Sequence, residues 1–142
     1  HVIPQFIMEF LRQIDGGTGI QIETKGSLEA VRAFCYVDDI VSGLTLLSEK
    51  NSGVNVYNIG NTQRITMSEL LGDIARILRC SYTVSQSNNE HVGGSMLRCP
   101  DISKIENLGY SCSVPLSQGL VNTINWYKDN FTKLSAVDSQ IY

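Results

Sequence analysis

The sequence contains no apolar run that approaches the roughly 20 residues needed to span a bilayer. It has two histidines and four cysteines, and no Cys-x-x-Cys pair, so the ligand spacing of a zinc site is absent. Basic residues are not in excess, because 11 Lys and Arg are scattered among 14 Asp and Glu. We therefore expect no membrane partner, no nucleic-acid partner and no metal, and we expect four reduced cysteines in a cytoplasmic protein. His1–Pro4 lacks the character of a signal peptide.

What is present is typical of one globular domain. The 142 residues are 42% hydrophobic and 18% charged, which is enough for a single core. Periodicity predicts helices over 4–14, from 38, from 67, over 101–108 and from 115, and strands over 20–24, 32–37, 54–59 and 82–85. We expect an α/β fold, a small mixed lobe of four to five helices and short strands. The strands are too short and scattered for a Rossmann sheet. The lobe spans 1–134, and 135–142 form a flexible tail.

Two helix beginnings carry specific predictions. Thr66 and Glu69 match a capping box. Asp38 is expected to cap the helix that follows it. Four apolar residues are expected to line one face of that helix: Ile40, Val41, Leu44 and Leu47.

Local motifs show little chemistry of their own. The glycine-rich stretches at 16–19 and 93–94 neither follow a strand nor open a helix, so neither matches a phosphate-binding loop. Asp38 and Asp39 could act as an acid–base pair, or as a helix cap and a first-turn carboxylate favoured by the helix dipole. The residues by themselves therefore indicate an α/β lobe without visible catalytic machinery.

Five short motifs in a fixed order say more. They are HVIPQFI at 1–7, RAFCYVDD at 32–39, YNIG at 57–60, RCPDISK at 98–104, and LGY at 108–110 with VPLSQGL at 114–120. Together, from His1 to about Phe131, they resemble the C-terminal part of the extended short-chain dehydrogenase/reductase family, the NAD-dependent nucleotide-sugar epimerases, dehydratases and decarboxylases. The second and fourth motifs look most like UDP-glucuronate decarboxylases, and dTDP-glucose 4,6-dehydratases come next.

The resemblance also implies what this chain lacks. Family members bind NAD on an N-terminal Rossmann domain with a glycine loop and a catalytic Tyr-x-x-x-Lys pair, and no tyrosine here has a lysine four residues on. The expectation is a fragment that binds a nucleotide-diphosphate sugar and carries no catalytic residue and no NAD of its own. Its partner is expected to be the missing Rossmann half, and the parent enzyme is expected to be a homodimer. The apolar face at 6–11 is expected to lie exposed for that half. A free-standing nucleotide-binding or protein-interaction module is the alternative.

The resemblance assigns the substrate to particular residues. Arg32 and Arg98 stand at family positions near the diphosphate, which a guanidinium binds through paired hydrogen bonds. The segments 2–5 and 19–21 frame the base and ribose, and Asn58 lies near the nucleotide. The implied substrate-binding residues are Val2, Ile3, Pro4, Gln5, Gly19, Ile20, Gln21, Arg32, Asn58 and Arg98. Five of them have an alternative: a surface ion pair for Arg32, a helix-start position for Arg98, core packing for Ile3 and Ile20, and a turn cap for Asn58.

Overall fold

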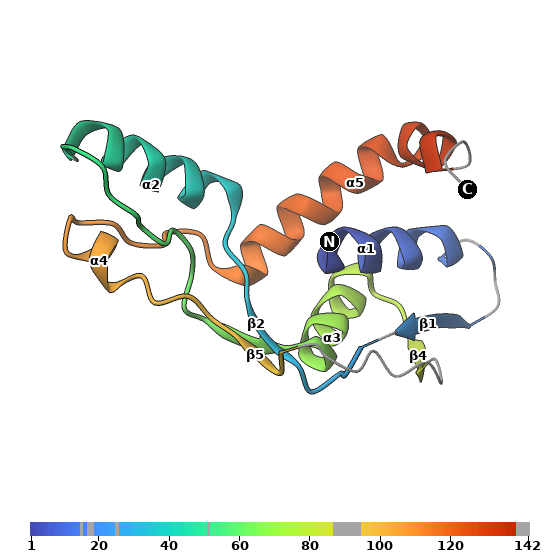
Figure 1. Ribbon diagram of the computed structural model, residues 1–142. Helices are drawn as coiled ribbons and strands as arrows, with labels where there is room; N and C mark the ends of the chain where they lie inside the picture. Colours follow the sequence, from blue (N-terminus) through green and yellow to red (C-terminus); the bar gives the residue numbers. More distant parts are fainter. Residues whose placement is uncertain (15, 17–18, 25, 51, 87–94, 139–142) are drawn as a thin grey trace.

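The computed structural model describes residues 1–14, 16, 19–24, 26–50, 52–86 and 95–138 and forms a mixed α/β lobe (Figure 1). The elements are α1 (Val2–Gln13), β1 (Ile20–Thr24), β2 (Val31–Ala33), α2 (Val37–Lys50), β3 (Arg64–Thr66), α3 (Met67–Leu78), β4 (Tyr82–Gln86), β5 (Leu97–Arg98), α4 (Ser103–Glu106) and α5 (Leu116–Asp138). β1 and β4 form a parallel pair. The second sheet has the order β3-β2-β5, with β2 antiparallel to β3 and parallel to β5.

The main core lies where α1, α3 and α5 pack around β1 (Figure 1). Side chains at helical spacing on each helix face inward, and Phe10, Ile74 and Ile124 are fully buried. The capping box at the start of α3 forms as predicted, because Thr66 Oγ1 accepts from the Glu69 N–H and Glu69 accepts from the Thr66 N–H. These local signals explain why the predicted elements of this part match the structure closely.

A second, smaller cluster lies apart from the main core, between α2 and α4 (Figure 1). Its buried members are Ile102, Ile105 and Tyr110, and Leu46 and Leu47 of α2 pack against it. Gly43 also faces this cluster, since a Cβ atom there would meet Ile59 and Tyr110. α2 therefore contacts the cluster through residues 39, 43, 46 and 47, which recur at helical spacing.

The apolar face of α2 is partly exposed, and the expectation that the apolar face of α1 is exposed was wrong. On α2, Val41 is 54% exposed and Leu44 is 56% exposed, because the face that turns inward carries Asp39 and Gly43 instead. On α1, the face at 6–11 is buried rather than exposed, because β1, α3 and α5 already cover it. α2 therefore carries exposed apolar side chains, among them Val37, which is 60% exposed.

Several element bounds also differ from the prediction. α2 begins at Val37, so Asp38 lies inside its first turn and is not the cap, and β2 ends at Ala33 instead of continuing to Val37. Residues 54–59 belong to no strand, although their pattern alternates, because no neighbouring strand among the described residues pairs with them; Val54 and Val56 are exposed. β3 and β5 were not predicted, since strands of three and two residues carry too little pattern to detect.

α5 continues to Asp138, so residues 135–138 of the expected tail are helical, and 139–142 lie outside the described residues. The glycine pair at 93–94 and part of the stretch at 16–19 also lie outside them. Within the described part, every helix is too short or too polar to cross a membrane.

Candidate functional site

A cavity of about 370 Å³ opens beside the N-terminal turn of α1. Val2, Gln5 and Phe6 line it from α1, Ala30 and Arg32 from the start of β2, and Met67 from the start of α3. The remaining lining residues come from the end of β1 and the loop after it: Glu23, Thr24, Gly26, Ser27 and Leu28. Three of the residues that the sequence assigned to substrate, Val2, Gln5 and Arg32, therefore meet at one cavity. Such a mixture of apolar walls and a few polar groups is typical of small-molecule sites.

The two arginines assigned to a diphosphate lie side by side. Arg32 and Arg98 are directly opposite one another in the parallel pair β2–β5, and residues opposite one another in a sheet project to the same face. Arg32 is half-buried and donates from Nη1 to the Val31 carbonyl at 2.7 Å, and Arg98 is exposed. Neither forms an ion pair with any residue that the structure describes. The structure therefore places two like charges together without a carboxylate between them.

Thr24 is a polar residue of this cavity that the sequence reasoning missed. Its side chain is 6% exposed, and its hydroxyl Oγ1 has no hydrogen-bond partner among the described residues. A buried hydroxyl without a partner costs about 1–3 kcal/mol in proteins, so such a group is often completed by a ligand. The alternation of Ile20, Ile22 and Thr24 on the inward face of β1 was the signal that could have identified it.

The other predicted substrate residues lie elsewhere. Ile3 lines a separate cavity of about 60 Å³ beside Phe34 and Gly119, and Pro4 lies in the first turn of α1. Ile20 is buried in the main core, which was the alternative for it, and Gly19 is exposed at the far end of β1. Gln21 exchanges two hydrogen bonds of 2.9 Å with the Gln13 side chain, through its backbone N–H and carbonyl.

Asn58 also lies away from the cavity, in the second cluster. Its Nδ2 donates to the Asp101 carbonyl at 3.0 Å, so it joins two segments of that cluster.

Asp39 ties α2 to the segment before α5. Its carboxylate accepts from the Ser113 N–H at 2.9 Å, the Ser113 hydroxyl at 2.8 Å and the Val114 N–H at 3.2 Å. Burial by itself would raise the pKa of Asp39, but these hydrogen bonds outweigh it and lower the pKa. Asp38 is exposed in the same turn of α2, so the pair is arranged as a helix start and a structural tie, not as an acid–base pair.

The described residues do not fit the pyrophosphate of a dinucleotide. Such a site needs a glycine-rich turn between a strand and the helix that follows it. Residues 34–36 join β2 to α2, α3 follows β3 directly, and residues 99–102 join β5 to α4, so none of these three junctions contains glycine.

Comparison with known proteins relates the chain to one family. Residues 1–60 match the model of the NAD dependent epimerase/dehydratase family. The chain is 35% identical over 120 residues to UDP-glucuronic acid decarboxylase 3 of Arabidopsis thaliana, covering 84% of this chain and 33% of that protein. It is 29% identical over 139 residues to dTDP-D-glucose 4,6-dehydratase of Bos taurus, covering 92% and 37%. It is 27% identical over 130 residues to probable GDP-L-fucose synthase 1 of Oryza sativa, covering 92% and 39%.

Solved structures share the fold. UDP-glucose 4-epimerase from Thermotoga maritima, solved with UDP-glucose, superposes with a TM-score of 0.77 at 26% identity, covering 92% of this chain and 40% of that one. dTDP-glucose 4,6-dehydratase from Streptomyces venezuelae, solved with NAD bound, gives 0.73 at 25% identity, covering 92% and 39%. The chain thus spans between about one third and two fifths of the length of these relatives.

Proposed function

Because this chain is related to the NAD dependent epimerase/dehydratase family over part of its members' length, we propose that it is the part of such an enzyme that binds a nucleotide-diphosphate sugar. The observation that carries the proposal is the cavity where Gln5, Thr24 and Arg32 meet, with Arg98 beside Arg32. NAD is bound by the remainder of the parent, since no described strand–helix junction fits it.

The cavity offers a partner for each portion of such a ligand. Arg32, with Arg98 on the same face of the sheet, supplies positive charge and planar donors for the two phosphates. The unpaired Thr24 hydroxyl and the Gln5 amide can each donate or accept one hydrogen bond, and the Glu23 carboxylate accepts from sugar hydroxyls. Val2, Phe6 and Met67 supply apolar walls for a base or ribose.

The exposed face of α2 supports the proposal that the remainder of the parent enzyme, which binds NAD, packs against this chain. Val37, Val41 and Leu44 lie on one helix at positions three or four apart, and all are more than half exposed. Contiguous exposed apolar side chains indicate a surface that packs against another protein part. In this proposal the NAD-binding remainder of the parent covers it.

Titration calorimetry with UDP, dTDP and GDP tests the binding site, because the names of the three relatives carry three different nucleotides. One of the three nucleotides is expected to bind. Arg32→Ala is expected to lower the affinity for it about 10- to 150-fold, because a charge-assisted hydrogen bond contributes about 1.5–3 kcal/mol. Thr24→Val is expected to weaken binding without lowering the stability of the free chain, since valine has the same shape and no unpaired hydroxyl.

Arg64→Ala is the matched control. Arg64 lies on β3 opposite Ala33, the neighbour of Arg32 on β2, and so projects to the other face of the sheet. The substitution therefore removes the same charge from the face that Arg32 does not share. Binding that falls equally in Arg32→Ala and Arg64→Ala would show a non-specific charge effect and refute the site. If none of the three nucleotides binds, the chain does not hold the nucleotide by itself and the proposal is wrong in this form.

A further inference from the structure

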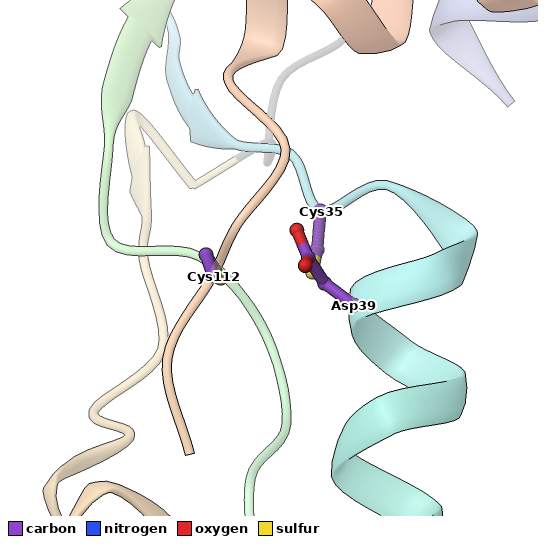
Figure 2. A group of neighbouring side chains, drawn as sticks. All are labelled: Cys35, Asp39 and Cys112. Atoms are coloured by element: carbon purple, nitrogen blue, oxygen red, sulfur yellow. The ribbon is translucent and has the colours of Figure 1, made fainter.

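Two cysteines and a buried carboxylate come together where α2 begins, Cys35 and Asp39 from neighbouring positions and Cys112 from a distant part of the sequence (Figure 2). Cys35 lies just before α2, Asp39 lies in its first turns, and Cys112 lies on the segment that leads to α5. One ligand atom from each, two sulfurs and a carboxylate oxygen, lies within 4.8 Å of the others. None of the three residues lines the cavity assigned to the nucleotide sugar.

We propose that Cys35, Asp39 and Cys112 form a binding site for one thiophilic divalent cation, best matched by Zn²⁺. Two soft thiolates with one hard carboxylate are a donor set that zinc accepts. At a tetrahedral zinc with Zn–S bonds of about 2.3 Å and a Zn–O bond of about 2.0 Å, two sulfurs lie about 3.8 Å apart and a sulfur and the oxygen about 3.5 Å apart, so atoms within 4.8 Å of one another need to approach by about 1.3 Å or less. Three protein ligands leave the fourth position for water, which can reach it because both cysteines are only half-buried.

Asp39 is already held in place for this role. Its Oδ1 accepts two hydrogen bonds, both from Ser113, whereas Oδ2 accepts only the longer one from the Val114 N–H. A carboxylate oxygen has two lone pairs, so Oδ2 keeps one for a metal ion. The fixed side chain loses little conformational freedom when the ion binds, and a hydrogen-bonded ligand is the arrangement typical of metal sites.

The surroundings of the two sulfurs also fit. Tyr110 Oη lies 3.4 Å from Cys112 Sγ and 3.7 Å from Cys35 Sγ, so its hydroxyl is positioned to donate to a thiolate. Cys112 Sγ also lies 3.0 Å from the Gly60 carbonyl, which accepts from Tyr110 Oη at 3.2 Å, so the single Tyr110 proton can serve either that carbonyl or a thiolate. Two thiolates, one carboxylate and Zn²⁺ sum to a charge of −1, smaller than the −2 of a Cys₄ zinc site.

Metal binding must displace the two thiol protons into the solvent. Burial is the main reason why the pKa of Cys35 is raised to about 11, and the neighbouring Cys112 and Asp39 add to it, although the hydrogen bond with Tyr110 acts the other way. The ion therefore competes with a firmly held proton at Cys35, and the observation that supports the site is the approach of the two sulfurs and a carboxylate oxygen within 4.8 Å of one another.

The test is titration of the reduced, chelator-treated 142-residue chain with Zn²⁺, and with Co²⁺ as a spectroscopic probe of thiolate coordination. We expect one ion per chain, two protons released, thiolate-to-Co²⁺ charge-transfer absorption, and a higher unfolding temperature with metal. Cys35→Ser and Cys112→Ser should each weaken binding by about 100-fold or more, since even outer contacts of a metal site are worth about 10- to 100-fold.

The matched control is the double variant Cys80→Ser/Cys99→Ser, which removes the two thiols outside the cluster. It should bind the metal ion as tightly as the unsubstituted chain does. Circular dichroism of each metal-free variant separates lost folding from lost binding, and Cys112→Ala provides a second form if a serine variant fails to fold. Metal uptake that survives in Cys35→Ser, uptake abolished by the control variant, or the absence of thiolate charge-transfer bands would each overturn the proposal.

Discussion

Replacing Gly43 with alanine tests whether α2 is held against the second cluster by direct contact. A Cβ atom at Gly43 would lie 2.6 Å from Ile59 Cγ2 and 3.1 Å from Tyr110 Cε2. Ile59 Cγ2 is attached to a branched Cβ with little rotational freedom, and the Tyr110 side chain is buried and hydrogen-bonded to the Gly60 carbonyl, so neither moves cheaply.

The expected magnitude combines two opposing effects. Glycine to alanine inside a helix stabilises by about 0.5–1 kcal/mol, because alanine restricts the unfolded chain. Overpacking at a close contact costs about 1–3 kcal/mol. Gly43→Ala should therefore lower stability by between about 0 and 2.5 kcal/mol, although the helix itself gains.

Gly72→Ala in α3 is the matched control, because its added Cβ would find no atom closer than the Tyr82 hydroxyl at 3.9 Å. Gly72→Ala should raise the free energy of unfolding by the whole gain from replacing glycine in a helix. The free energies of unfolding of the two variants should therefore differ by the overpacking cost alone, about 1–3 kcal/mol. Urea unfolding gives the two midpoints, and hydrogen exchange in α2 and α3 shows whether each effect is local to its helix. Equal stabilisation by both variants would refute the close packing of α2 against Ile59 and Tyr110.

Two further predictions follow from other elements. Hydrogen bonds from the Thr66 backbone N–H and hydroxyl lower the pKa of Glu69, so the α3 N-terminus should keep its full stability above the ordinary pKa of glutamate and lose it as pH falls through the lowered value. An NMR titration of Glu69 checks this, and Glu69→Gln, which keeps a capping box, should abolish the pH dependence of the helix start; an ordinary pKa would contradict it. Val41→Lys on the exposed face of α2 should change stability by no more than about 0.5 kcal/mol, whereas Leu70→Ala in the core should cost about 2–5 kcal/mol. The lysine should also reduce concentration-dependent association of the chain in sedimentation experiments, and a large stability loss there would show that Val41 is buried after all.

Local sequence determined those elements whose signals lie within a few residues. The Thr66–Glu69 capping box begins α3, and alternation defines β1, because both depend on neighbours along the chain. The order of five motifs indicated the family, whereas the substrate role that it assigned to Val2, Gln5 and Arg32 stays a prediction, and the structure shows that these three residues line one cavity. Residues 54–59 alternate like a strand, but the sequence near them does not show whether a partner strand exists, and in the described part of the chain none pairs with them.

Tertiary structure alone decided which distant residues meet. The sheet register sets Arg98 beside Arg32, and burial leaves the Thr24 hydroxyl without a partner among the described residues at the cavity. Which face of α2 is buried followed from where Ile59 and Tyr110 pack, since helical spacing allows an apolar stripe to face either the core or another protein part. Cys35 and Cys112 approach one another where Asp39 ties α2 to the segment before α5, a contact between residues that no spacing rule relates.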